Sequence, residues 1–153
     1  MRGFSLVELM IAITIFTILC LAAIPAFLRF AENNNLKAAT RDITTDIAIM
    51  KETAQTRSIE YQNQGIQCQI NFNTGANNYT LIMPDGNQVK TPTVFSRDIV
   101  ITNANFAGGG PAMIFQPRGT ATNGTITLQN SRGSTATITA NITGRTYAQF
   151  NMQ

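Results

Sequence analysis

MRGFSLVELM IAITIFTILC LAAIPAFLRF, residues 1–30, is the stretch that decides the fold of this chain. Leu9 to Leu28 is an uninterrupted run of 20 residues without a charge. As a helix, a run of this length crosses a hydrocarbon core of roughly 30 Å. Glu8 stands at its start, although a carboxylate at mid-bilayer costs about 2.5–3.5 kcal/mol on insertion scales. The stretch therefore predicts a membrane anchor, and the cost of its one acid, Glu8, calls for a functional explanation.

Three ordinary explanations compete for this segment. A cleaved signal peptide would use Arg2 as its basic region, but its apolar core usually has about 7–15 residues and no acid. A lipoprotein signal ending at Cys20 would want small residues before the cysteine, where this chain has Ile18 and Leu19. In an ordinary single-pass anchor, Glu8 would lie in the first helical turn, where the helix dipole favours an acid.

One motif resembles the processing site of type IV pilins and type II secretion pseudopilins: Gly3-Phe4-Ser5-Leu6-Val7-Glu8-Leu9. The resemblance implies that a prepilin peptidase cuts between Gly3 and Phe4 and that the new N-terminal Phe4 is methylated. Glu8 is then fifth in a mature chain of 150 residues. Pro25 matches a proline of the same helix in that family, where it softens the helix.

The same resemblance implies a role for Glu8. In such fibres the apolar helices bundle at the centre, and the glutamate meets the N-terminal amine of a neighbouring subunit. A buried carboxylate is costly without a partner, and pairing with an amine relieves that cost. Glu8 is therefore expected to act in assembly.

A second helical stretch follows the apolar one. Apolar residues recur at spacings of three and four, which predicts one buried stripe on a helix; they are Leu36, Ala39, Ile43, Ile47, Met50 and Ala54. We expect one helix from about Phe4 to about Thr56, softened at Pro25 and near Asn33–Asn35. This divides the chain into a leader (1–3), an apolar half-helix (4–30), an amphipathic half-helix (31–58) and a β-rich domain (59–153).

From Ile66 the period changes from helical to alternating, which is typical of half-buried strands. Pro84–Asn87 and Ser131–Ser134 carry turn residues. Seven strands are predicted, at residues 66–72, 79–83, 99–102, 113–116, 125–129, 136–142 and 145–150. The fold class is therefore α+β, with a long N-terminal hydrophobic helix packed on antiparallel sheet.

The C-terminal half extends the resemblance. Three short motifs resemble the soluble domain of GspH/FimT-type minor pseudopilins and minor pilins: Ile114–Gly119, Gly124–Leu128 and Gly144-Arg145. That family has two antiparallel sheets beside the helix, so the resemblance implies two sheets in this chain.

No catalytic constellation is visible in the sequence. The chain has no histidine, which removes the commonest general base and metal ligand. Cys20 lies in the apolar helix and Cys68 in a predicted strand, so a disulfide between them is not expected. We therefore expect no enzyme activity, no cofactor and no metal.

The predicted function is that of a structural subunit of a type IV pilus or a type II secretion pseudopilus. Its expected partners are the prepilin peptidase, other pilin or pseudopilin subunits and, before assembly, the bacterial inner membrane, with the globular domain in the periplasm. The alternative is a FimT-like minor pilin that binds DNA for uptake, through Arg118, Arg132 and Arg145. The sequence alone leaves both kinds of fibre open.

Overall fold

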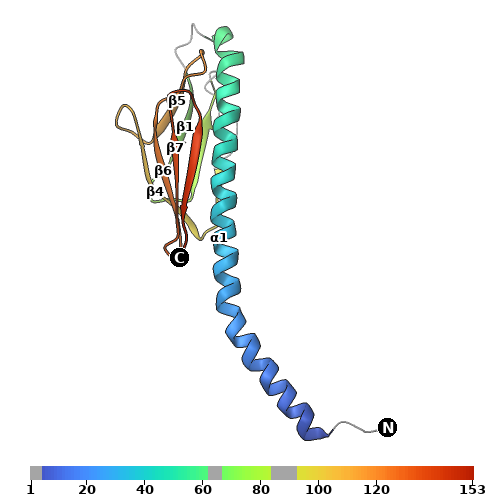
Figure 1. Ribbon diagram of the computed structural model, residues 1–153. Coiled ribbons are helices and arrows are strands. Elements are labelled where there is room, and N and C mark those ends of the chain that lie inside the picture. Colours follow the sequence, from blue (N-terminus) through green and yellow to red (C-terminus); the bar gives the residue numbers. More distant parts are fainter. Residues whose placement is uncertain (1–4, 62–66, 84–92) are drawn as a thin grey trace.

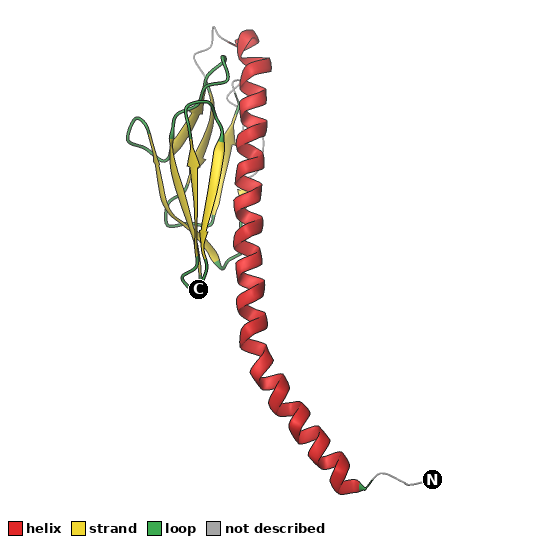
Figure 2. Ribbon diagram, viewed as in Figure 1, coloured by secondary structure: helices red, strands yellow, loops and turns green. Residues whose placement is uncertain are grey.

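The computed structural model describes residues 5–61, 67–83 and 93–153, which form one helix beside a β domain (Figures 1 and 2). In chain order the elements are α1 (Leu6–Tyr61), β1 (Cys68–Phe72), β2 (Asn78–Ile82), β3 (Thr93–Val94), β4 (Ile99–Phe106), β5 (Ala112–Phe115), β6 (Gly124–Asn130), β7 (Thr135–Ala140) and β8 (Thr146–Asn151).

Helix α1 is continuous over 56 residues, which confirms the prediction of a single helix. It passes through Asn33–Asn35 without interruption. It also ends at Tyr61, so residues 59–61, which the sequence assigned to the β domain, are helical. Figure 1 shows that the N-terminal part of α1 curves away from the axis of the rest. Pro25 lies inside the helix and has no N–H to donate to the carbonyl of Leu21, a known cause of bending.

The predicted apolar stripe is the face of α1 that meets the β domain. All six of its residues are at most 4% exposed: Leu36, Ala39, Ile43, Ile47, Met50 and Ala54. They form one core cluster with residues from both sheets. The domain thus covers only the second half of α1 (Figure 1).

The described strands form two antiparallel four-stranded sheets, in the orders β3-β2-β1-β5 and β4-β6-β7-β8. This confirms the fold class and the two sheets that the family resemblance implied. Phe72 of the first sheet stacks on Phe106 of the second, with ring centroids 5.7 Å apart. Aromatic contact therefore joins the two sheets inside the core.

The seven predicted strands correspond to β1, β2 and β4–β8. Their ends shift by one or two residues, except that β4 continues to Phe106, four residues beyond the prediction. The prediction missed β3, which has two residues. It also extended β7 too far, because Ile142 lies in the turn after β7 and is 63% exposed. Ile66 and the predicted turn Pro84–Asn87 lie outside the described residues.

Four three-residue hairpin loops share one design. In each, the first residue and the fifth close the loop with a backbone hydrogen bond, and a glycine in fourth place has φ between 70° and 87°. The loops are Phe106–Gly110, Gln116–Thr120, Asn130–Ser134 and Asn141–Arg145. The last two begin with an asparagine whose side-chain oxygen accepts backbone N–H groups of the loop. Glycine suits these positions because L-residues disfavour a positive φ.

Polar contacts fix the second half of α1 to the hairpin loops at both ends of the β domain. At one end Arg132 Nε lies 2.9 Å from Glu32 Oε2, and Asn130 Nδ2 donates to Asn33 Oδ1 over 3.1 Å. At the other end Lys51 Nζ donates to the carbonyl of Thr143 over 2.8 Å. Since Glu32 and Lys51 are 19 residues apart, these contacts are separated by about 28 Å along the helix.

One acid of α1 is buried against the first sheet. Asp46 is 7% exposed, and its Oδ2 accepts a hydrogen bond from the hydroxyl of Tyr79 over 2.6 Å. Burial raises the pKa of the Tyr79 hydroxyl strongly, and the hydrogen bond to Asp46 raises it further. The neutral hydroxyl is therefore the form that the fold requires.

We predict that Tyr79→Phe lowers the free energy of unfolding at neutral pH by about 1.5–3 kcal/mol, because it removes a hydrogen bond to a charged group. Above about pH 10 an unfolded tyrosine loses its proton while Tyr79 in the fold keeps it, so wild-type stability falls as pH rises. Urea unfolding of the full chain in detergent, followed by circular dichroism at pH 7 and pH 10.5, measures both. An alkaline loss equally steep in Tyr79→Phe would contradict this account.

Two glycine substitutions separate steric conflict from backbone strain. A Cβ on Gly124 would lie 2.3 Å from the backbone oxygen of Asn105 and 2.7 Å from Cα of Phe106, so β4 and β6 would have to move apart. A Cβ on Gly109 meets nothing within 4 Å, but φ there is +82°. We predict that Gly109→Ala costs about 1 kcal/mol of stability and that Gly124→Ala costs about 3 kcal/mol. The same urea titration tests this order, and equal losses would refute it.

Candidate assembly surface

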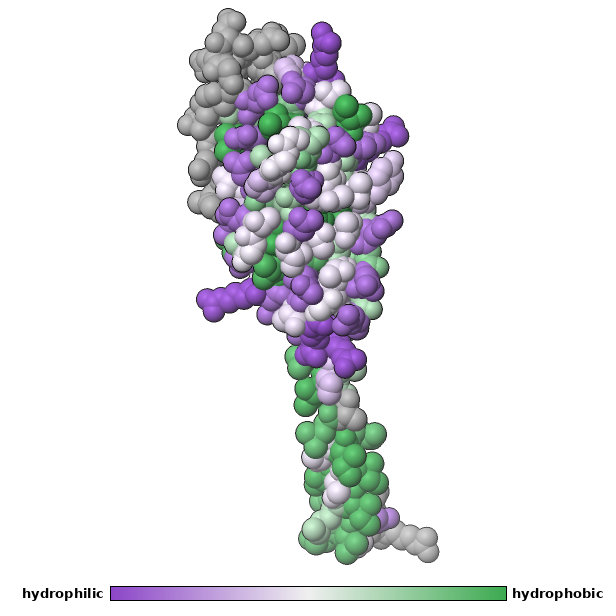
Figure 3. Space-filling model, turned by 90° about the vertical axis from the view of Figure 1, so that its left-hand side faces the viewer, coloured by the Kyte–Doolittle hydropathy of each residue, from purple (hydrophilic) through white to green (hydrophobic). Residues whose placement is uncertain are grey.

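The first half of α1 presents an apolar surface on all sides. Every residue from Leu6 to Phe30 whose burial is described is exposed, and Phe16 and Phe27 are each 69% exposed. Figure 3 shows this half as an apolar stalk, with hydrophilic residues gathered where it joins the domain. The helix is long and apolar enough to cross a membrane, and the most apolar window has no share buried inside the protein. A helix that is apolar all round requires lipid or other apolar helices around it.

Glu8 lies in the first turn of α1, as its sequence position predicts. The carbonyl of Ser5 accepts the first helical hydrogen bond, from the N–H of Leu9. In return Glu8 Oε2 accepts the N–H of Ser5 over 3.3 Å. Ser5 and Glu8 thus form half of a capping box, a pattern readable from Ser-x-x-Glu that the sequence analysis missed. This contact holds the carboxylate near the N-terminal end of the helix.

The hydroxyls inside the apolar half are bonded within the helix itself. Thr14 and Thr17 each donate to the carbonyl four residues earlier, over 2.8 Å in both cases. Such back-bonding suits side chains that face lipid, where no water can serve as partner. Gly3 and Phe4, the predicted cleavage and methylation positions, lie outside the described residues.

The structure does not bring the three candidate DNA-binding arginines together. Arg132 pairs with Glu32 at one end of the domain and lines a hollow with Arg29, beside the apolar half of α1. Arg145 follows Gly144, whose Cβ position lies 3.0 Å from Lys51, so Arg145 belongs to the opposite end. Arg118 precedes Gly119, which approaches Gln55 at that same opposite end. The arginines therefore do not form one basic patch.

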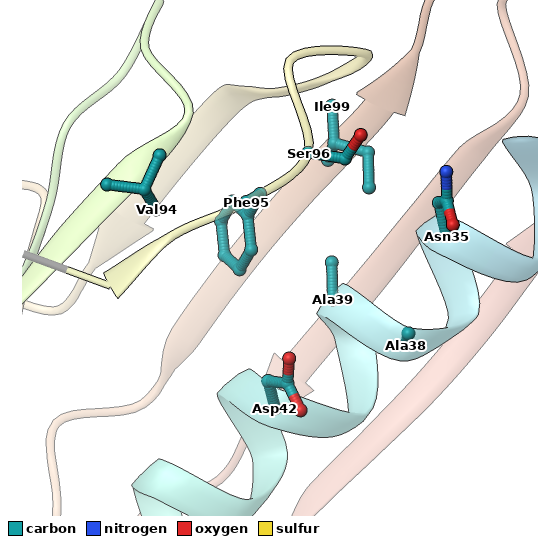
Figure 4. Close-up of a pocket in the computed structure, with 8 residues that line it drawn as sticks. All are labelled: Asn35, Ala38, Ala39, Asp42, Val94, Phe95, Ser96 and Ile99. Carbon is teal, nitrogen blue, oxygen red and sulfur yellow. The ribbon is translucent and has the colours of Figure 1, made fainter.

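Hollows of opposite charge lie on the two flanks of α1. One, of about 160 Å³, lies between α1 and the segment from β3 to β4 and includes Asp42 (Figure 4). There Phe95 points toward α1, while Val94 lies farther from the helix and is 63% exposed. The other, of about 240 Å³, lies between α1 and β8 and includes Lys37 and Arg41.

The described residues contain no group of three or more His, Cys, Asp and Glu side chains that could hold a metal ion. Cys68 is fully buried in β1 and Cys20 is exposed on the apolar half of α1, and no disulfide joins the two. Asp46 is committed to Tyr79 in the core. The candidate functional surface of the described chain is the exposed helix with Glu8, together with the flanks of α1.

Comparisons with known proteins agree with this geometry. Residues 1–24 match the model of the prokaryotic N-terminal methylation motif, and residues 39–144 match the family model of type II transport protein GspH. No curated protein sequence matches the chain significantly. The minor pseudopilin EpsH from the Type 2 Secretion System of Vibrio cholerae has a similar fold, with a TM-score of 0.54 and 13% sequence identity over 76% of this chain and 97% of that chain. The GspH family and the pilin-like fold are those of structural subunits, not of enzymes. The chain belongs to the GspH family and is a membrane-anchored, pilin-like subunit of the pseudopilin or minor pilin kind.

Proposed function

We propose that the chain is processed by a prepilin peptidase between Gly3 and Phe4, methylated at Phe4 and inserted into a fibre through its apolar half-helix. Glu8 then pairs with the N-terminal amine of a neighbouring subunit. The observation that carries the proposal is the position of Glu8: an exposed acid in the first turn of a helix that is apolar on all sides. Before assembly the same half-helix holds the subunit in the inner membrane.

Bundling of the apolar halves supports the pairing of Glu8. When a helix leaves lipid for a bundle, its apolar surface stays covered, but a carboxylate carried into that bundle needs a countercharge. The N–H of Ser5 satisfies one oxygen of Glu8 and carries no full charge. An amine supplied by a neighbour neutralises the carboxylate and sets the axial position of one subunit against the next.

The N-terminal methylation motif supports a periplasmic domain. Arg2 is the one basic residue before the apolar run. Arg29, Lys37 and Arg41 follow the run, so the count of basic residues does not set the orientation. We place the leader, residues 1–3, on the side of the peptidase, as the motif implies. The N-terminus is then cytoplasmic, where Gly3 and Phe4 meet the peptidase, and the β domain lies across the membrane in the periplasm.

Blocking the cleavage position tests the processing step. We predict that Gly3→Leu keeps the full chain of 153 residues, because a bulky side chain replaces the glycine on the leader side of the cut. The wild type loses residues 1–3 and gains the mass of one methyl group on Phe4. Intact-mass spectrometry of chain purified from membranes of its own host reads both results. Wild-type chain that retains residues 1–3 would contradict the proposal.

Removing the acid tests the assembly step. We predict that Glu8→Ala stays in the membrane but falls at least about tenfold in sheared fibres, a factor that corresponds to about 1.4 kcal/mol. Glu52→Ala is the matched control, since Glu52 is an exposed acid of the same helix, outside the apolar half. Immunoblots of membrane and fibre fractions measure the ratio. Equal recovery of the two variants in fibres would refute the role of Glu8.

A further inference from the structure

The edge strands of the two sheets differ in how well the chain protects them from pairing with another strand. A bare edge strand invites pairing with another chain, so proteins usually shorten, bend or cover it. Edge strand β3 has two residues, and residues 120–122 bond to the outer edge of β5. Edge strand β4 is bulged between Ile101 and Asn103, and its Ile101 exchanges hydrogen bonds with Gly75 and Ala76. Three edges are therefore protected by the chain itself.

Strand β8, the fourth edge, has no such protection from the described residues. Its sequence, TYAQFN, contains no charge, proline or glycine. Tyr147 is 59% exposed and Phe150 is 43% exposed. Within residues 5–61, 67–83 and 93–153, no backbone hydrogen bond to its outer edge is found. A six-residue, uncharged, aromatic edge is the kind that natural proteins keep covered.

The register shows which backbone groups face outward. The N–H of Asn141 donates to the carbonyl of Arg145, and β7 and β8 continue in the same register. Because bonded and non-bonded pairs alternate in antiparallel pairing, the N–H and C=O groups of Thr146, Ala148 and Phe150 point away from β7. These residues offer an evenly spaced set of donors and acceptors to a further strand.

The hollow beside β8 adds side-chain recognition. Ala148 and Phe150 pair with Ile138 and Ala136 of β7, which are fully buried, but they are themselves exposed. The sheet thus extends one strand beyond the cover that α1 provides. The hollow of about 240 Å³ is bounded by these two apolar side chains and, on α1, by residues that include Lys37 and Arg41. Neither cation forms an ion pair with a described residue.

We propose that the β8 edge and this hollow dock an extended segment of a different pilin-like subunit that neighbours this chain in the fibre. The segment adds a fifth strand beside β8, places apolar side chains on Ala148 and Phe150, and brings a carboxylate to Lys37 and Arg41. Backbone pairing supplies affinity and the alternate side chains supply selectivity, as in other strand-addition complexes. The positive charge of the hollow favours an acidic segment. The proposal rests on the function proposed above, because that function makes the adjacent chain another subunit of the fibre.

The test places the photoreactive residue p-benzoylphenylalanine at Phe150 of the full chain, in host cells that make every subunit of the fibre. Irradiation is expected to yield an adduct that mass spectrometry identifies as a different pilin-like subunit, joined through a segment with alternating apolar residues and an Asp or Glu. The same probe at Val94, on the opposite flank, is expected not to give that product. An adduct with lipid, with a second copy of this chain or with an unrelated protein would overturn the proposal.

Variants at one position test the pairing itself. Ala148→Pro removes an outward N–H and leaves the β7–β8 hydrogen bonds in place, whereas Ala148→Val keeps the N–H. We expect the proline variant to lower the adduct at least about fivefold, the factor for one lost backbone hydrogen bond, and the valine variant to retain it. Should the proline variant misfold, the pair Lys37→Glu and Arg41→Glu, both on the exposed face of α1, is expected to lower the adduct similarly. An adduct unchanged in the folded variants would overturn the proposal.

The fibre fraction separates this proposal from the one on which it rests. If the chain were not a fibre subunit, wild-type chain would be absent from sheared fibres, and both proposals would fall. If wild-type chain enters fibres through Glu8 but the Phe150 adduct does not respond to Ala148→Pro or to charge reversal, only the docking site on β8 is refuted.

Discussion

Helix α1 passes through two environments: its first half needs lipid or other apolar helices around it, and its second half packs into the core of the β domain. The arrangement of the other elements depends on where along α1 one environment gives way to the other. The 56 residues of α1 span about 84 Å. Up to Phe30 the exposed apolar surface requires lipid or other helices, and from Leu36 one stripe is buried in the core. The change falls at Glu32 and Asn33, which bind the hairpin between β6 and β7. The β domain is thus fixed beside the membrane half without covering it.

Period and composition made the frame of the fold predictable from the sequence. The stripe from Leu36 to Ala54 repeats every three or four residues, and its burial follows directly from that spacing. Strands such as β6 and β7 alternate strictly because one face meets the core. The assembly role proposed for Glu8 comes from another signal in the sequence: an acid conflicts with its apolar surroundings, and such conflicts often mark function.

What escaped prediction depends on contacts between distant segments. Asp46 borders the buried stripe and would ordinarily face water, and its partner Tyr79 lies 33 residues later. Ile142 continued the alternation of β7, but Asn141 and Gly144 close a loop there, with the same Asn-x-x-Gly spacing that ends β6. The edge of β8 is equally invisible in sequence, because its exposure follows from the lack of a neighbour among the described residues and not from the strand itself.

The unbroken course of α1 through Asn33–Asn35 has a mechanical consequence. A subunit drawn out of a bilayer is loaded along its helix, and a continuous helix carries that tension without a slack joint. The attachments at Glu32 and Lys51 lie about 28 Å apart on the same rod. Axial force on the domain is therefore applied in shear, across the whole buried stripe at once, so that the contacts resist together and the domain moves with its anchor.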